Sequence, residues 1–463
     1  MLTELRIQNF KAWKDTGSVR LAPLTVIFGA NSAGKSSLGH LLLALKQTAL
    51  LTDRKRALHL GDANSPIDLG TFADCLHGHD LRAKLELTLG WRLPAAVTLS
   101  NPIQRGESYS GDAMRLESSI RADRNDQPQT ESFTYTLLND GVETLRARHW
   151  LDEKGKPEIE AKPLNLIMKM GRKWPIEAPE KFYRFADVTL ARYQNADALT
   201  EFPLQLERML SGLTYLGPLR EPPKRTYPWA GDSVPDVGQR GERAIPALLS
   251  ARQEDRMLNR GPKQRRHPFD VFIAQWLRDL GVIDQFEVKP VAKGRKEYEV
   301  LVRTAKNSPQ VKLTDVGFGV SQVLPALVQA FYAQPDTTVW MEQPEIHLHP
   351  RVQAALADAF ISAVQSSENG KARNVQLIVE SHSEAFLMRL QRRIAEEMIR
   401  PEDVAVYFVR QTSSGVDLEA LELDMFGEIE NWPDDFFGDE MSEIVARTAA
   451  AVSRQQKTGS AHE

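Results

Sequence analysis

The residues with the clearest chemistry form the stretch GANSAGKSS, from Gly29 to Ser37. It fits the pattern of a glycine, four residues, a glycine, a lysine and a serine. The glycines let backbone N–H groups converge on the phosphates of a nucleotide, and the following helix presents its positive N-terminal end. Lys35 would supply a point charge, and the Ser36 hydroxyl would ligate Mg²⁺. The expected nucleotide-binding residues are Gly29, Ala30, Asn31, Ser32, Ala33, Gly34, Lys35, Ser36 and Ser37.

A second signal is the stretch TTVWMEQPEIHLHP, from Thr337 to Pro350. It predicts a buried strand that runs into a loop with two acids. Glu342, at the end of the strand, would lie beside the phosphate loop and hold Mg²⁺ through water, so Ser36 and Glu342 are the expected metal ligands. Gln343 follows directly, where many ATP-hydrolysing proteins have a second acid. The chain has no Asn-Lys-x-Asp stretch for guanine readout, which favours ATP over GTP.

Three histidines near these acids have ordinary structural interpretations. His347 and His349 share a face of an extended segment, but zinc normally needs at least three protein ligands, and the neighbouring sequence offers no others. His382, in the stretch ESHSE, taken alone is most often a buried histidine at the end of a strand. The histidine pair therefore predicts no metal site.

The elements around these residues predict an α/β fold. Residues 4–10 and 23–29 have strand patterns, and residues 36–51 have a helical one. The stretches 285–291 and 297–304 predict a hairpin. Helical spacing at 320–334 is followed by strands at 337–341 and 374–382, with a helix between them. Alternating helices and strands imply a parallel sheet.

These motifs, in this order, resemble the head of an ABC-type ATPase. The similarity is to the branch of SMC, RecF and OLD-type proteins rather than to transporters. It rests on LRIQNFKAW, LTVIFGANSAGKSSL, TDVGFGVSQVLPAL, VWMEQPEIHLHP and LIVESHSEAF, and covers roughly residues 1–75 and 310–410. The resemblance implies a P-loop ATPase head, with a mostly parallel sheet, an antiparallel β subdomain, and an inserted mixed α/β arm. It implies ATP and Mg²⁺ as cofactors.

The resemblance also assigns roles to single residues. Glu342 takes the place of the metal-holding acid, and His382 matches the switch histidine that senses the γ-phosphate. The stretch GFGVSQ stands where such heads carry a signature loop that reaches across a dimer to the nucleotide of the other subunit. This implies a homodimer or higher homo-oligomer through the heads. The signature is degenerate, so the candidates for the contact are Gly319, Ser321 and Gln322, and no Q-loop glutamine can be assigned.

Gln343 stands in the place of the catalytic glutamate of such heads. A neutral amide cannot take a proton from water, and losing a general base costs about 10² to 10⁴ in rate, or roughly 3 to 5.5 kcal/mol in barrier. The catalytic set of Glu342, Gln343 and His382 therefore predicts an ATPase with slow turnover and a long-lived ATP-bound dimer. Gln343 could still orient water, or Glu345 or Glu380 could supply the carboxylate.

Composition divides the chain into four expected parts. Residues 1–90 and 211–425 are the two parts of the ATPase head, 91–210 is a polar inserted arm or lid, and 426–463 is a C-terminal tail domain. With a net charge of −4, one cysteine (Cys75) and no long apolar run, the chain is expected to be soluble and cytoplasmic, without a membrane partner.

The tail stretch FGEIENWPDDFF is similar to a short C-terminal domain of unknown function on one bacterial branch of these ATPases. Members of that branch often act in anti-phage defence beside a separately encoded effector, as in PARIS- or Septu-like systems. The resemblance implies a sensor or scaffold without a nuclease domain of its own that controls a nuclease or toxin. The alternatives are a RecF-like repair ATPase that binds DNA through basic clusters at 53–56, 260–267 and 389–393, and an interaction protein with a decayed nucleotide site.

Overall fold

The computed structural model describes residues 1–104, 106–171, 175–260, 264–368, 370–412, 415–433, 447–448 and 450. Most of the predicted tail at 426–463, and part of the basic cluster at 260–267, lie outside these residues. Within the described part of the chain, no helix has both the length and the apolar character needed to cross a membrane.

A six-stranded sheet forms the centre of the molecule, in the order β10-β17-β20-β4-β21-β22. The first five strands pair in parallel, and β22 runs antiparallel to β21. This order confirms the predicted α/β fold with a mostly parallel sheet. The strands are β4 (Leu24–Gly29), β10 (Leu213–Leu216), β17 (Thr338–Glu342), β20 (Gln376–Glu380), β21 (Val404–Thr412) and β22 (Gly415–Leu421).

Alternate residues of the central strands face two separate cores. Val26 of β4 belongs to the core formed with helices α5 to α9, whereas Ile27 belongs to the core formed with α1 and α4. Strands covered on both faces read as continuous apolar runs. The helices are α1 (Lys35–Leu50), α2 (Phe72–Cys75), α3 (Asp187–Ala191), α4 (Glu201–Ser211), α5 (Ala244–Gln253), α6 (Phe269–Asp279), α7 (Phe318–Tyr332), α8 (Pro350–Gln365) and α9 (Glu384–Ala395).

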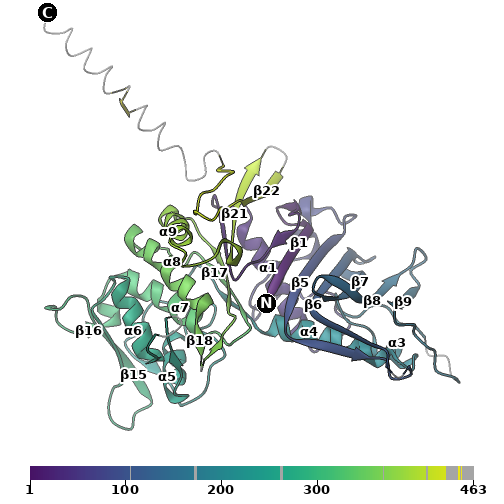
Figure 1. Cartoon of the computed structure of the whole chain (residues 1–463), viewed down its shortest axis with the longest axis horizontal. Helices are drawn as coiled ribbons and strands as arrows, with labels where there is room; N and C mark the ends of the chain where they lie inside the picture. The colour runs from purple at the N-terminus through teal and green to yellow at the C-terminus, as the bar shows by residue number, and fades with distance from the viewer. Residues whose placement is uncertain are drawn as a thin grey trace, which may run out of the picture.

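A large antiparallel sheet lies on one side of the central sheet, opposite the helices α5 and α6 (Figure 1). Its order is β2-β1-β5-β6-β7-β8-β9, and β3 pairs with β1. The domain boundary expected between residues 90 and 91 falls inside β5, which pairs with β1 at the start of the chain. The strands are β1 (Leu2–Phe10), β2 (Trp13–Asp15), β3 (Val19–Arg20), β5 (Leu85–Ser100), β6 (Ser108–Ala122), β7 (Pro128–Asn139), β8 (Val142–Leu151) and β9 (Pro157–Lys162).

Short strands complete the helical side of the molecule. β14 and β15 pair antiparallel from Gln285 with Arg303 to Pro290 with Tyr298, which confirms the predicted hairpin. The strands are β11 (Tyr227–Pro228), β12 (Met257–Leu258), β13 (His267–Pro268), β14 (Gln285–Pro290), β15 (Glu297–Arg303), β16 (Val311–Lys312), β18 (Ser367–Glu368) and β19 (Lys371–Ala372).

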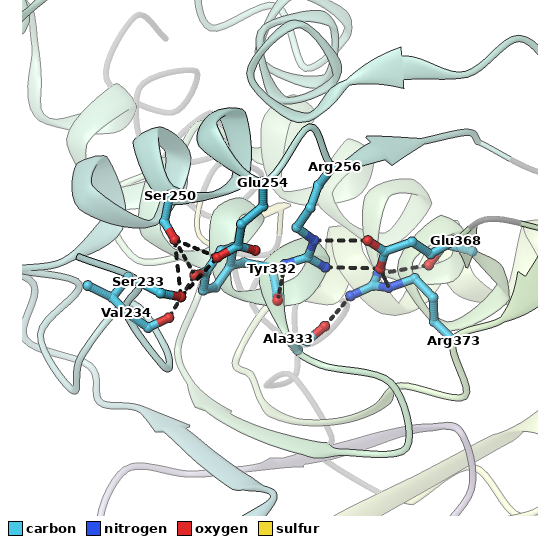
Figure 2. Close-up of polar contacts among 10 residues, drawn as sticks. Ser233, Val234, Ser250, Glu254, Arg256, Tyr332, Ala333, Glu368 and Arg373 are labelled. Atoms are coloured by element: carbon cyan, nitrogen blue, oxygen red, sulfur yellow. Dashed lines mark hydrogen bonds and ion pairs between the residues drawn. The ribbon is translucent and has the colours of Figure 1, made fainter. Parts of the chain in front are cut away.

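Two buried arginines hold the C-terminal end of α7 (Figure 2). Arg256 donates to the carbonyl of Tyr332 at 3.0 Å and to both oxygens of Glu368 at 2.9 and 3.1 Å. Arg373 donates to the carbonyl of Ala333. Cations at this end satisfy carbonyls that have no partner within the helix and favour its dipole. The network therefore anchors α7 at the end far from its signature residues.

Replacing Arg373 by alanine is expected to lower the free energy of unfolding by about 3 to 5 kcal/mol, because Ala333 loses its donor and a buried charge network loses one member. Chemical denaturation followed by tryptophan fluorescence measures the change. The control is Arg400→Ala, since Arg400 is exposed and pairs with Asp403 at the surface; no measurable change is expected there. Equal unfolding midpoints for wild type and Arg373→Ala would contradict the anchoring role.

Candidate functional site

The phosphate loop lies between β4 and α1, at the carboxyl edge of the central sheet. β4 ends at Gly29 and α1 begins at Lys35. Gly29 and Gly34 have φ angles of 146° and 99°, a region that favours glycine. A Cβ on Gly29 would lie 2.5 Å from the carbonyl oxygen of Val409. The loop can pass this close to β21 only because Gly29 has no side chain.

Trp13 of β2 braces the phosphate loop from the antiparallel sheet. Its Nε1 donates to Ser37 Oγ at 2.9 Å and to the carbonyl of Gly34 at 3.1 Å. Ser37 itself donates to the Gly34 carbonyl. In this structure the Ser37 hydroxyl thus supports the loop from within, which ties the loop geometry to the N-terminal strands.

Lys35 is buried and folds back on its own loop. Its Nζ donates to the carbonyls of Gly29 at 2.8 Å and Ala30 at 2.7 Å. Burial lowers the pKa of the lysine, and the charges of three carboxylates oppose that shift, those of Glu380, Glu345 and Glu342. The ammonium group therefore stands between the loop and a cluster of acids, where the phosphates of a nucleotide would meet it.

The Ser36 hydroxyl lies between two carboxylates. Its Oγ is 3.0 Å from Glu342 Oε2 and 2.8 Å from Glu380 Oε2. The acids meet because β17 and β20 are parallel neighbours, with Glu342 directly opposite Glu380. Trp340 donates to the second oxygen of Glu380 at 2.8 Å. The strand register thus places two acids at the start of α1.

The two carboxylates differ in charge. Burial acts to raise the pKa of Glu342, but hydrogen bonds from His40 and Tyr215 outweigh it and hold that pKa below its usual value. The Tyr215 hydroxyl donates to Glu342 Oε1 at 2.6 Å. Burial and the charge of Glu342 raise the pKa of Glu380 to about 8. The pair therefore carries close to one negative charge at neutral pH.

The oxygen atoms of Ser36, Glu342 and Glu380 fit Mg²⁺. This cation prefers oxygen ligands and is usually bound by one or two carboxylates together with substrate phosphates. A cation here would also relieve the repulsion between the two acids. Within the described residues no cluster of three or more His, Cys, Asp or Glu side chains could hold a metal. The donor set therefore suits a cation shared with phosphates rather than one held by protein alone.

Glu345 and His382 form a second polar cluster at the same edge. Glu345 Oε1 accepts from Ser381 Oγ at 2.8 Å and from the backbone N–H of His382 at 2.7 Å. Within the described residues, Glu345 Oε2 and His382 Nε2 are buried and have no hydrogen-bond partner. Burial and the charge of Lys35 lower the pKa of His382 to about 4. A neutral His382 ring thus presents a free nitrogen near Lys35, as a phosphate sensor would.

Gln343 is held at the same edge through its backbone. Its N–H donates to the carbonyl of Glu380 at 2.8 Å, and its φ of 45° marks the sharp turn that ends β17. His349 is the N-cap of α8 and accepts from the N–H of Arg351. The His349 side chain is therefore explained by helix capping.

The signature residues lie at the N-terminal end of α7. Gly317 is the N-cap and is exposed, and Gly319 is half-buried. Ser321 and Gln322 are buried within the chain. A Cβ on Gly319 would approach Leu348 of the loop after β17 at 3.7 Å. Gly317 and Gly319 are therefore the described residues of the signature that remain accessible.

The sequence patterns did not single out His40 of α1, which pairs with Glu342, nor Tyr215 and Arg220. Tyr215 lies on β10, and Arg220 lies on the loop that leaves β10. Arg220 Nη2 donates to the backbone carbonyl of Glu342 at 3.2 Å. The only sequence signal was a short apolar stretch, LTYL, before a Pro- and Gly-rich segment. Nothing in it shows that β10 pairs with β17 and brings both residues to Glu342.

The basic clusters are largely occupied by ion pairs. Arg389 and Arg393 both pair with Asp358 at 2.6 Å. Arg54 pairs with Asp187 at 2.6 Å. Such pairing leaves less free charge for a nucleic-acid backbone, whose binding depends on unpaired cations. The DNA-binding alternative therefore gains no support from Arg54, Arg389 and Arg393.

A phosphate loop after a central parallel strand, with an acid at the end of a strand two positions away, defines a P-loop protein of the ATPase type. The family comparisons agree. Residues 271–387 match the family described as "AAA ATPase domain". This matched range includes Glu342 and His382. Residues 399–446 match the family described as "Protein of unknown function (DUF3696)". No curated protein matches the chain.

Solved structures similar to the chain are SMC heads. An Smc head bound to the C-winged helix domain of ScpA has 12% identity and a TM-score of 0.41, covering 91% of this chain and 98% of that chain. An SMC head from Thermotoga maritima has 10% identity and a TM-score of 0.38, covering 91% of this chain and 99% of that chain. An Smc head bound to the C-terminal domain of ScpA, from Pyrococcus furiosus, has 11% identity and a TM-score of 0.39, covering 91% of this chain and 96% of that chain. Because these TM-scores are below 0.5, the fold assignment is based on the strand order and the phosphate loop and not on these structures.

Proposed function

We propose that the protein is a slow, Mg²⁺-dependent ATPase whose ATP-bound form closes into a homodimer through its heads. The observation that carries the proposal is the meeting of Lys35 and Ser36 with Glu342 at one edge of the central sheet. A cation, a hydroxyl and an acid at the start of a helix are what a nucleotide triphosphate with Mg²⁺ requires. The match to an ATPase domain family supports the same activity.

The side chains of the site divide the work of hydrolysis. Mg²⁺, when bound, supplies positive charge to the β- and γ-phosphate oxygens. Lys35 neutralises phosphate charge, and Ser36 and Glu342 provide oxygen ligands. His382, neutral at physiological pH, offers Nε2 to the γ-phosphate. Gln343 can hold a water by hydrogen bonding but cannot take its proton, and this limits the rate.

Dimer closure is proposed to use the first turn of α7. The N–H groups of a helix's first turn have no partners within the helix, and the Gly317 N-cap gives this turn no side-chain cap. A helix N-terminus of this kind attracts phosphate. Gly319 would lie in contact with the nucleotide of the other copy, while the buried Ser321 and Gln322 hold the turn in place.

We further propose that the closed dimer controls a separately encoded effector, a nuclease or toxin, in anti-phage defence. The support is the resemblance of the motifs to ATPases of such systems. The test is a phage-challenge assay in which the gene is expressed with its chromosomal neighbours. Protection that needs both Lys35 and a neighbouring gene supports this role, and protection that is indifferent to Lys35→Ala contradicts it.

The ATPase proposal itself predicts a change of mass with nucleotide. With ATP and Mg²⁺ the purified protein is expected to double in mass by light scattering, and with ADP or with EDTA present it is expected to remain monomeric. Steady-state turnover is expected to be far below tens per second, because the loss of a general base lowers the rate by about 10² to 10⁴-fold. A protein that binds no ATP, or that stays monomeric with ATP and Mg²⁺, would contradict the proposal.

A further inference from the structure

Arg220 is a buried cation with most of its hydrogen-bonding capacity unused. It is 6% exposed. One nitrogen, Nη2, donates to the carbonyl of Glu342, while Nε and Nη1 have no hydrogen-bond partner among the residues that the structure describes. Burial lowers the pKa of Arg220 to about 10, so the guanidinium group remains positive at neutral pH. A buried charge left in this state costs stability.

Arg256 is a buried arginine of this chain whose side-chain nitrogens are all partnered. It is 8% exposed, and all three of its side-chain nitrogens donate, two to Glu368 and one to the carbonyl of Tyr332 (Figure 2). Arg220 has equal burial without equal pairing. Unsatisfied buried polar groups call for an explanation, and a ligand is one of the few available.

The surroundings of Arg220 point to an anion as that ligand. Glu342 and Glu345 act electrostatically on both Arg220 and Lys35, so the two cations flank the same two acids. Glu345 Oε2 and His382 Nε2 are also buried and lack a hydrogen-bond partner in the described part of the chain. Unused donors and acceptors from three loops therefore converge at one edge of the sheet, as in a site for a phosphate and its waters.

Strand order says which phosphate Arg220 would meet. The phosphate loop follows β4, whereas Arg220 follows β10, three strands away across β20 and β17. At about 4.8 Å per strand this separation is about 14 Å. Lys35 and the loop serve the end near β4, and Arg220 serves the far end, beyond the acids. A triphosphate held at Lys35 and extending toward the acids would bring its terminal phosphate to this end.

Resting on the function proposed above, we infer that Arg220 binds the terminal phosphate in the same chain and makes the site distinguish a nucleoside triphosphate from a diphosphate. The planar guanidinium fork matches phosphate oxygens in a way that a lysine does not. Its backbone is fixed on both sides, because Gly217 N–H donates to Gln239 and Glu221 N–H donates to Arg240, each at 2.8 Å. The group is thus positioned before the nucleotide arrives.

Arg220→Met tests the inference, with Arg225→Met as the matched control, since Arg225 lies five residues on and is exposed in a pair with Asp315. Affinities for Mg²⁺-ATPγS and Mg²⁺-ADP are measured by calorimetry, together with the melting temperature without nucleotide. Arg220→Met is expected to weaken ATPγS binding by about 10- to 100-fold and ADP binding by less than about twofold. Its nucleotide-free melting temperature is expected to equal or exceed that of wild type, because an underpartnered charge is removed.

A purely structural Arg220 gives a different result. Equal losses for ATPγS and ADP, with a lower melting temperature, would overturn the inference, and so would unchanged affinity for both nucleotides. Arg220→Lys is expected to recover only part of the ATPγS affinity, because it restores charge without the fork. Wild-type protein that binds neither nucleotide would instead refute the proposed function, and the two failures are therefore distinguishable.

Discussion

The Gln343→Glu variant is expected to hydrolyse ATP about 10² to 10⁴ times faster than wild type in a single-turnover experiment. That range is what a positioned general base contributes, or roughly 3 to 5.5 kcal/mol of barrier. The site already has the other parts of the reaction, a lysine, a hydroxyl and an acid at the phosphate loop. What the site lacks is a general base, a group that accepts a proton from water, at the position after Glu342.

Geometry favours a gain at this position rather than elsewhere. The backbone of Gln343 is pinned to Glu380 at 2.8 Å, so a glutamate side chain would start from the same point. Glu380 has both oxygens engaged, by Ser36 and Trp340. Glu345 holds the His382 backbone with one oxygen and keeps the other free. Of the existing acids, Glu345 is therefore the one able to compete as a base.

Single-turnover measurement separates chemistry from dimer opening, which can limit the steady-state rate. Gln343→Ala is the control, because it removes the amide without adding a base and is expected to be no faster than wild type. A Gln343→Glu rate equal to the wild-type rate would contradict the prediction. If Glu345→Gln then reduced the wild-type rate 10²-fold or more, Glu345 would be the base.

Local pattern was enough to predict the phosphate loop and the sheet that carries it. The glycine spacing at Gly29 and Gly34 predicts the turn because both residues have positive φ angles that favour glycine, and Gly29 also lies too close to Val409 for a side chain. The alternation of helices and strands predicted a parallel sheet, because strands that are joined through helices pair in the same direction. Glu342 could be placed as the first polar residue after a buried run.

The pairing of strands that lie far apart in the sequence could not be predicted from local sequence patterns. Glu380 meets Ser36 only because β20 inserts between β17 and β4 in a register that sets it opposite Glu342. Arg220 reaches the site only because the four-residue β10 pairs with β17. Likewise, β5 pairs with β1 across about 80 residues, so the polar stretch after residue 91 continues an N-terminal sheet. Long-range register of this kind leaves no local periodic signal.

Replacing Lys35 by alanine is expected to weaken ATP binding by about 10² to 10⁴-fold and to abolish ATP-dependent dimerisation. The magnitude follows from removing one partner of a buried charge pair, which costs about 3 to 5 kcal/mol. The loss of ATP affinity is expected near the upper end of this range, because the charges of Glu342, Glu345 and Glu380 act on Lys35. Without the ammonium group these acids face the incoming triphosphate with less opposing charge.

Lys46→Ala is the matched control, because Lys46 lies on the same helix, is half-buried, and donates to the carbonyls of Ser211 and Leu213 away from the phosphate loop. It is expected to leave ATP affinity unchanged even if it lowers the melting temperature. Fluorescent ATP titration gives both affinities, and light scattering gives the mass. ATP binding by Lys35→Ala as tight as that of wild type would show that the triphosphate lies elsewhere, and the assignments of Ser36, Glu342 and Arg220 to it would fall with that result.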